Sequence, residues 1–168
     1  MSSEKTLILD RKQIQQKLHR IAHELYETHF GEKELVVVGI SGQGYFLAKR
    51  ITSILKKISP IQLHLAELKL DKKQPIGHPF MLRGLKTGLA HKSIVLIDDV
   101  LNSGKTLIYG AKILLDHPLK RITTVVFVNR RHRLFPIRAD IVGLTLSTTL
   151  QEHITVMLEK GKEAVYLE

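Results

Sequence analysis

The sequence contains no cysteine among its 168 residues, which excludes disulfide bonds and thiolate chemistry and gives no reason to expect secretion. It also contains no apolar run that approaches the length of a membrane span. The first residues include Glu4, Lys5 and Asp10 and do not have the pattern of a signal peptide. We therefore expect a cytoplasmic protein that does not associate with membranes.

Acidic residues are also few: the sequence has 16 Asp and Glu and 26 Lys and Arg, which gives a formal net charge of +10. This excess favours polyanionic partners, either phosphate compounds or nucleic acid, although a basic surface without a specific partner carries the same charge. The hydrophobic content of 43% is typical of a folded globular protein. The length predicts a single domain over residues 1–168.

Apolar patterns along the chain alternate between the strand period and the helix period. The predicted strands cover residues 6–9, 34–40, 62–70, 93–99, 121–129, 139–144, 154–158 and 164–167. The predicted helices cover residues 11–28, 45–57 and 105–116, and Asp10 is expected to cap the first of them. Strands that alternate with helices predict an α/β fold in which helices flank a mostly parallel central sheet.

The most informative stretch is SIVLIDDVLNSGKTL, over residues 93–107. Its apolar run predicts a buried strand that carries Asp98 and Asp99 at its carboxyl end, where open α/β sheets bind ligands. The loop from Asn102 to Thr106 combines amides at a helix start, a glycine, hydroxyls and a cation, which together favour a phosphate. Two carboxylates repel phosphate, so we expect them at the surface with hydroxyl donors or a metal as partners. A phosphorylated sugar offers both kinds of group.

Other interpretations of this stretch fit less well. A nucleoside triphosphatase loop requires glycine where Asp99 stands, and the dinucleotide-binding fingerprint requires glycine where Leu47 stands. A strand that ends in a helix-capping turn needs only one acidic residue and no run of Ser, Gly, Lys and Thr.

Two further segments are expected at the same edge of the sheet. The glycine-rich turn Ser41-Gly42-Gln43-Gly44 leads from a strand into a helix, which suits either an anion site or an ordinary tight turn. The basic run Arg130-Arg131-His132 follows another strand on the ligand side.

Residues 71–92 have no sustained period and contain several lysines, prolines and glycines. Long loops in compact domains are often functional, so we expect a lid over the site, without regular structure and mobile in the absence of ligand.

The first helix has a basic face made of Lys17, His19, Arg20 and His23. The two histidines are four residues apart, a spacing that suits a metal, but the sequence offers no third ligand. A solvated or anion-facing surface is the better interpretation, and we treat these four residues as a candidate RNA-binding face.

Taken together, these motifs resemble the type I phosphoribosyltransferases, and in particular the pyrimidine operon attenuation protein and uracil phosphoribosyltransferase family. The resemblance covers nearly the whole chain, and its most specific part is the run RHRLFPIRAD over residues 131–140, which no general requirement of a fold dictates. It implies the type I phosphoribosyltransferase fold, with a small hood formed by the terminal segments. It also implies a homo-oligomer, a dimer or larger.

The resemblance also assigns roles to residues. It implies that Asp98 and Asp99 hold the ribose hydroxyls of 5-phosphoribosyl-1-pyrophosphate, with Mg²⁺ held near them mainly by the substrate. The substrate-binding residues that it implies are Asp98, Asp99, Val100, Leu101, Asn102, Ser103, Gly104, Lys105 and Thr106. The implied pyrophosphate loop is Ser41, Gly42, Gln43 and Gly44, and Arg130, Arg131 and His132 are candidates for the side of the base.

The implied reaction transfers the phosphoribosyl group to a base and releases pyrophosphate. The family implies uracil, and Asn102, which stands where purine-using relatives keep an aspartate, also favours a pyrimidine. Two alternatives remain: an RNA-binding regulator of pyrimidine gene expression that responds to nucleotides, and a nucleotide sensor with little turnover.

Three departures from the family concern the substrate side. Basic residues of the pyrophosphate loop are replaced by Ser41 and Gln43, the lid segment has Leu70-Asp71-Lys72-Lys73 in place of Tyr-Arg-Asp-Asp, and Leu146-Ser147-Thr148-Thr149 replaces a Pro-Thr-Ser segment. These departures weaken the expectation of uracil and leave the expected fold unchanged.

Overall fold

The computed structural model describes residues 4–77 and 79–168. Its elements follow the predicted order, with one additional strand, β4. They are β1 (Thr6–Leu9), α1 (Arg11–Thr28), β2 (Glu34–Ile40), α2 (Gln43–Ile58), β3 (Gln62–Lys69), β4 (Met81–Arg83), β5 (Ser93–Leu101), α3 (Lys105–Leu114), β6 (Arg121–Asn129), β7 (Ile141–Thr145), β8 (Ile154–Met157) and β9 (Ala164–Leu167).

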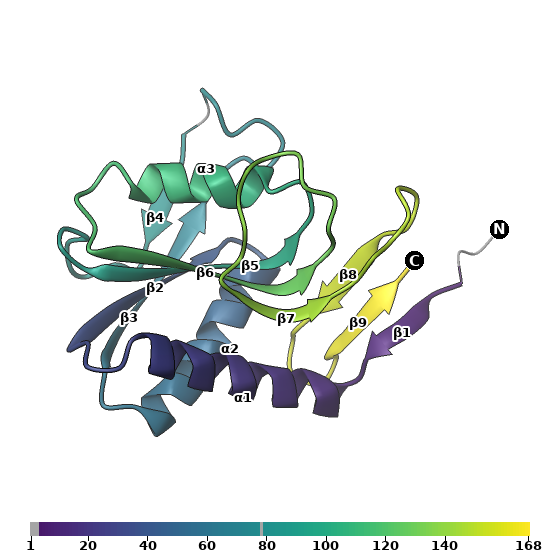
Figure 1. Cartoon of the computed structure of the whole chain (residues 1–168), viewed down its shortest axis with the longest axis horizontal. Helices are drawn as coiled ribbons and strands as arrows, with labels where there is room; N and C mark the ends of the chain where they lie inside the picture. Colours follow the sequence, from purple (N-terminus) through teal and green to yellow (C-terminus); the bar gives the residue numbers. More distant parts are fainter. Residues whose placement is uncertain (1–3, 78) are drawn as a thin grey trace.

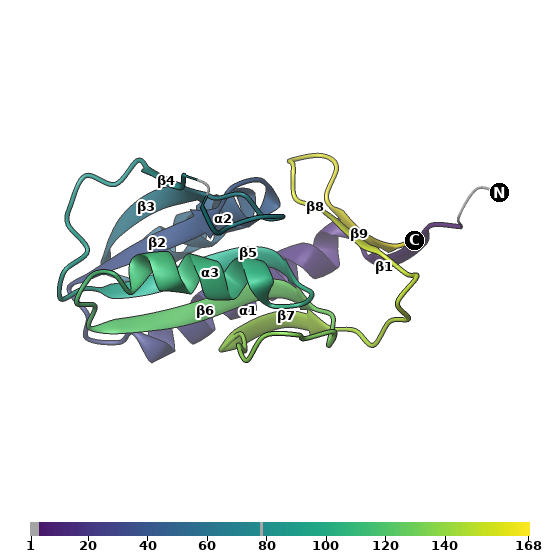
Figure 2. The same cartoon turned by 90° about the horizontal axis from the view of Figure 1, so that it is seen from above.

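The main sheet has six strands in the order β4-β3-β2-β5-β6-β7. Five of them are parallel to one another, and β4 joins the edge antiparallel to β3. α1 and α2 cover one face of this sheet and α3 covers the other (Figure 1 and Figure 2). The predicted α/β class with a mostly parallel central sheet is therefore confirmed.

The terminal segments form a second sheet, in the order β1-β9-β8, with antiparallel pairing throughout. This sheet lies beside the end of the larger sheet at which the parallel strands finish (Figure 2). The predicted hood of terminal segments is confirmed, and it pairs β9 with β1.

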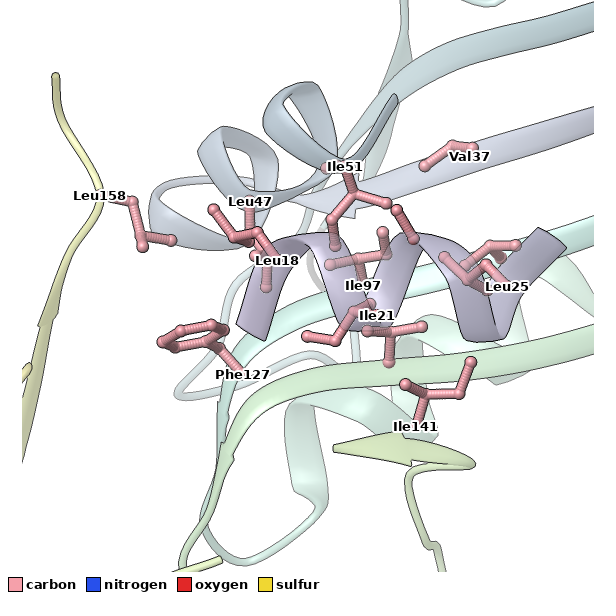
Figure 3. Packing of buried hydrophobic residues seen from close by; sticks show 14 of the residues in the cluster. Leu18, Ile21, Leu25, Val37, Leu47, Ile51, Ile97, Phe127, Ile141 and Leu158 are labelled. Atoms are coloured by element: carbon pink, nitrogen blue, oxygen red, sulfur yellow. The ribbon is translucent and has the colours of Figure 1, made fainter. Parts of the chain in front are cut away.

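Each face of the main sheet has its own apolar core. The larger core packs α1 and α2 against the sheet, and the smaller one lies under α3. Figure 3 shows the larger core, where Leu18, Ile21 and Leu25 of α1 point towards the sheet and Phe127 of β6 lies beside them. Burial of each such side chain stabilises the fold by about 1.5 to 3 kcal/mol, so these cores fix the strands that position the site.

Helix α1 forms where the sequence predicted it, because Asp10 caps it. The Asp10 carboxylate accepts a hydrogen bond from the Gln13 amide at 2.8 Å, and the Gln13 side chain accepts one from the Asp10 amide at 3.0 Å. The helix buries one apolar stripe, which consists of Ile14, Leu18, Ile21, Ala22 and Leu25. No described helix is long and apolar enough to cross a membrane.

Some predicted boundaries were wrong. Helix α2 begins two residues earlier than predicted, at Gln43, and α3 ends two residues earlier, at Leu114. The predicted structureless segment 71–92 contains β4, which sequence periodicity missed because three residues are too few to show a pattern. The predicted lid therefore consists of two stretches on either side of an edge strand.

Candidate functional site

The acid pair lies on a central strand. Asp98 and Asp99 belong to β5, which pairs with β2 on one side and with β6 on the other. Val100 and Leu101 extend the strand two residues beyond the acids. The pair is thus near the carboxyl end of β5, at the edge where βα turns collect and where parallel sheets bind ligands.

Asp98 is buried, with 3% of its surface exposed, whereas Asp99 is half-buried. The expectation that both acids lie at the surface was wrong for Asp98, because the start of α2 covers it. A methyl group built on Gly44 would lie 3.0 Å from Asp98 Oδ1, so a side chain at position 44 would require the Asp98 carboxyl group to shift. Burial, and next the negative charge of Asp99, raise the pKa of Asp98 well above its ordinary value. The site therefore favours a cation or hydroxyl donors beside this carboxyl group.

The loop after β5 forms a small hollow of about 50 Å³ that Asp98 and residues 100–107 line. Gly104 caps α3 in the left-handed conformation, with φ of 87°, and a methyl group there would lie 2.8 Å from Ile137 Cγ2. Ser103 Oγ accepts a hydrogen bond from the Lys105 amide at 3.2 Å. The hollow lies at the start of α3, where the first amides of a helix have no partner within it, and this gives the loop the chemistry of a phosphate site.

The turn from β2 to α2 has a related shape. Gly42 precedes α2 with φ of 91°, and the first amides of a helix have no partner within it. The side chains of this turn are directed elsewhere: Ser41 Oγ donates to Glu67 Oε1 at 2.8 Å, and Gln43 Oε1 accepts from the Leu158 amide at 3.1 Å. The turn therefore offers amides but no side-chain cation, and Gln43 attaches the hood to α2.

Two lysines of the segment after β3 lie at this same edge. Lys72 Nζ is 3.8 Å from Asp98 Oδ1, and Lys105 Nζ donates to the Lys73 carbonyl oxygen at 2.9 Å. The sequence predicts Lys72 only as part of the lid segment and not as a residue of the site. Its position directly after a parallel strand was the available signal, because such strands finish at one common edge.

The three basic residues after β6 differ in their surroundings. Arg130 is buried, its Nε donates to Thr148 Oγ1 at 2.7 Å, and its Nη2 donates to the carbonyl oxygens of Thr149 and Glu152. A ring nitrogen of His132 lies 2.8 Å from the Thr148 carbonyl oxygen. Arg130 and His132 thus hold the loop that precedes β8, and Arg131 is the exposed member of the group.

Arg130 also reaches the acid-bearing strand. Its Nη1 donates to Asn102 Oδ1 at 3.4 Å, a long hydrogen bond that connects the two loops across the edge of the sheet.

The basic face of α1 is partly used within the fold. Arg20 pairs with Glu24 and donates to the carbonyl oxygens of Val142 and Gly143 in β7. His19 and His23 are exposed, and Lys17 is half-buried. No group of three or more His, Cys, Asp or Glu residues that could hold a metal occurs in the described ranges. His19 and His23 therefore do not belong to such a group among the described residues.

The comparison with protein families gives one domain description, the phosphoribosyl transferase domain, matched over residues 5–158. Curated relatives carry the name bifunctional protein PyrR. The one from Macrococcus caseolyticus is 36% identical over 173 aligned residues, which cover 98% of this chain and 99% of that protein. The one from Leuconostoc citreum is 37% identical, with 94% of this chain and 95% of that protein covered.

Solved structures share the fold at much lower identity. A hypoxanthine-guanine phosphoribosyltransferase from Bacillus anthracis superimposes with a TM-score of 0.77 at 16% identity, covering 98% of both chains. A hypoxanthine phosphoribosyltransferase from Trypanosoma cruzi gives a TM-score of 0.81 at 12% identity, covering 99% of this chain and 96% of that one. At these identities the likeness concerns the fold alone.

Proposed function

The chain belongs to the phosphoribosyltransferase family and groups with the PyrR proteins, and we propose that it transfers a phosphoribosyl group from 5-phosphoribosyl-1-pyrophosphate to uracil. The observation that supports the proposal is that hydrogen-bond acceptors for hydroxyl groups and donors for a phosphate lie together at one edge of the sheet. Asp98 and Asp99 offer carboxylate acceptors, and the adjacent hollow offers amides, hydroxyls and Lys105. A sugar with free hydroxyls and a phosphate on its fifth carbon suits both.

The protein contributes positioning and charge. The ribose hydroxyls donate to the two carboxylates, and the 5′-phosphate accepts from the amides at the start of α3. The bond between carbon 1 and the pyrophosphate oxygen breaks with both electrons on the oxygen. A nitrogen of the base then forms the new bond to carbon 1 and loses its proton to solvent. Fixed donors and acceptors lower the barrier because charge develops at carbon 1 and on the leaving group.

Magnesium fits the acid pair. Two adjacent carboxylates, one of them buried with a raised pKa, favour a neighbouring cation, and the described residues nearby offer too few ligands to hold a metal without the substrate. When bound, Mg²⁺ would supply positive charge that offsets the negative charge of the leaving group. Asp98 and Asp99 are the residues that would face it.

Label transfer tests the proposal. With radiolabelled 5-phosphoribosyl-1-pyrophosphate and Mg²⁺, we expect label to move to uracil and not to adenine, guanine or hypoxanthine, with one pyrophosphate released per nucleotide. The Asp98→Asn, Asp99→Asn double variant is the matched control and should transfer nothing. Absence of transfer to every base by the wild-type chain, at saturating substrate, would contradict the proposal.

A second candidate function is RNA binding as a regulator of pyrimidine gene expression. The net charge of +10 favours it, and so do the exposed His19 and His23 of α1. Binding to a pyrimidine-operon leader RNA should weaken steeply with salt. The His19→Ala, His23→Ala variant should lose affinity for RNA and keep its affinity for phosphoribosyl pyrophosphate. Arg20 is a poor test residue because its contacts to β7 make it part of the fold.

Three further expectations belong to the proposal: one domain over residues 1–168, a cytoplasmic location and a homo-oligomeric state. Light scattering of the purified chain, with and without phosphoribosyl pyrophosphate, tests the last of these. A monomer at micromolar concentration would contradict it.

A further inference from the structure

The β2–α2 turn lacks a cation of its own. The Ser41 hydroxyl donates a hydrogen bond to Glu67, and the Gln43 side-chain oxygen accepts one from the Leu158 amide. Neither of these side-chain groups is therefore directed at an anion on the turn. Backbone amides are dipoles and leave most of the charge of a pyrophosphate unneutralised. If this turn holds the leaving group, positive charge has to come from another part of the chain.

Lys72 is a lysine that the structure places beside Asp98. Its ammonium is 3.8 Å from Asp98 Oδ1, and a methyl group built on Gly44 would lie 3.0 Å from that same oxygen atom. Both positions are close to one atom, which places the ammonium at the side of the site where α2 begins. At 3.8 Å the pair is too long for a hydrogen bond, and 45% of the Lys72 side chain is exposed. The lysine can therefore exchange partners at low cost.

A hydrogen bond attaches the backbone next to Lys72 to the β5–α3 turn. Lys105 Nζ donates to the Lys73 carbonyl oxygen at 2.9 Å. This contact connects the segment after β3 to the start of α3, close to the acid pair. Asp98 lines the hollow as well and is the residue that Lys72 approaches, so a substrate bound at the hollow would lie near this segment.

We propose that Lys72 neutralises the pyrophosphate, replacing the cation that the β2–α2 turn lacks. In the free protein its ammonium partly offsets the buried charge of Asp98. When the substrate binds, the ribose hydroxyls become the partners of Asp98 and Lys72 moves to the pyrophosphate. As the bond to carbon 1 breaks, the electron pair adds negative charge to the oxygen that leaves, and Lys72 binds that charge more strongly. The assignment rests on the proposed function.

Titration with inorganic pyrophosphate in the presence of Mg²⁺ tests the assignment without turnover. We expect Lys72→Gln to weaken pyrophosphate binding about 10- to 100-fold, which is the range of a charge-assisted contact. Lys86→Gln is the matched control because it removes an equal charge from an exposed lysine of the same connection, and its affinity should stay within about twofold of the wild type. Lys72→Arg should retain binding. Melting temperatures of all variants exclude loss of folding.

Single-turnover rates measure the chemical step separately from binding, so they show whether Lys72 also stabilises the transition state. Lys72→Gln should slow the chemical step as well as weaken binding, and adding Gln43→Arg should restore part of both, because it supplies a cation from the other side of the turn. Equal pyrophosphate affinities for Lys72→Gln and Lys86→Gln, in a chain whose wild type binds phosphoribosyl pyrophosphate, would overturn the assignment of Lys72 alone. A wild type that binds neither compound would overturn the proposed function, and this assignment with it.

Discussion

The two strand-to-helix turns at the carboxyl edge of the sheet are alike in shape and differ in chemistry. Each places a glycine with positive φ immediately before a helix, Gly42 before α2 and Gly104 before α3. In the β5–α3 turn the side chains line the hollow, whereas those of the β2–α2 turn bind Glu67 and the hood. The β5–α3 turn therefore carries hydroxyls and a lysine beside its amides, whereas the β2–α2 turn offers amides without a side-chain cation.

This difference shows that a glycine turn gives an anion site its shape, while neighbouring elements decide how much charge it carries. Lys105 belongs to the β5–α3 turn itself. Lys72 comes to Asp98 from the segment after β3, and we assign it to the β2–α2 turn. Substitutions in each turn can separate the contribution of backbone shape from that of side-chain charge.

The largest effect is expected from the acid pair. Asp98→Asn with Asp99→Asn should reduce affinity for phosphoribosyl pyrophosphate about 100-fold or more, because each carboxylate accepts hydroxyl hydrogen bonds worth about 1.5 to 3 kcal/mol. The corresponding change in the other turn, Ser41→Ala with Gln43→Ala, should reduce it less than about fivefold, since the amides remain. Calorimetry with Mg²⁺ measures both, and equal losses would show that the turns are chemically equivalent.

The stability of the acid-pair variant should move in the opposite direction to its affinity. The backbone amide of Asp99 donates to Asp98 Oδ1 at 2.9 Å, and the asparagine introduced by Asp98→Asn keeps an oxygen to accept this bond. The substitution also removes a buried charge beside a like charge. We expect the free energy of unfolding to rise by about 1 kcal/mol at pH 7. Urea unfolding measures it, and a clear loss of stability would show that Asp98 is structurally required as a charge.

The glycines give the next largest effect. Gly104→Ala and Gly42→Ala should each destabilise the chain by about 1 to 3 kcal/mol through backbone strain. Only Gly104 also meets a neighbour, Ile137 Cγ2 at 2.8 Å, while nothing described lies within 4 Å of a methyl group on Gly42. Ile137→Ala should therefore partly rescue Gly104→Ala and leave Gly42→Ala unchanged. A double-mutant cycle by urea unfolding tests this, and equal rescue at both positions would contradict it.

A smaller effect concerns the hood. Gln43→Ala leaves the amide of Leu158, a buried residue, without its acceptor, which should cost about 1 to 2 kcal/mol. Hydrogen exchange should then accelerate in β8 and β9 and stay unchanged in β5. Ser41→Ala is the control, because it removes a hydrogen bond to β3 instead of one to the hood. Faster exchange in β8 and β9 for both variants would show that the hood depends on the turn in general.

The sequence predicted the parts of this molecule that depend on local pattern. The buried runs, the Asp10 cap and the order of helices and strands follow from period and capping, and the glycine-and-hydroxyl loop follows from what a phosphate needs. The hood was predicted from family resemblance, because short strands far apart in the chain show no local sign of pairing.

The rest depended on tertiary contacts. The burial of Asp98 needs the start of α2, which lies more than fifty residues earlier in the chain, and the position of Lys72 needs the parallel register of β3 with β2. Likewise, Arg130 looked like a ligand-facing cation because it follows a strand at the ligand edge. Its hydrogen bonds to Thr148 and Thr149 could not be anticipated without knowing how the chain returns from β7 to β8.

The smallest effect is expected from His29, which lies near the start of β6, at the edge of the sheet opposite the two turns. This prediction tests whether protonation of His29 changes stability without changing affinity for phosphoribosyl pyrophosphate. His29 is 1% exposed, a ring nitrogen lies 3.1 Å from Thr123 Oγ1 near the start of β6, and its Nδ1 has no hydrogen-bond partner among the described residues. Burial, and next the positive charge of Arg121, lower the pKa of His29 below 6.5; Lys120 acts in the same direction, and Glu32 opposes it. The unfolded chain therefore binds a proton more readily than the folded chain, and stability should decline as the pH falls from about 6.5 towards the lowered pKa. His29→Gln should remove this decline, about 1 kcal/mol or less, without changing affinity for phosphoribosyl pyrophosphate. Urea unfolding of the wild type and of this variant between pH 5 and 8, at intervals of about half a pH unit, measures the difference.

A change of affinity in His29→Gln would show that the two edges of the sheet are coupled and that the difference between the turns is not purely local.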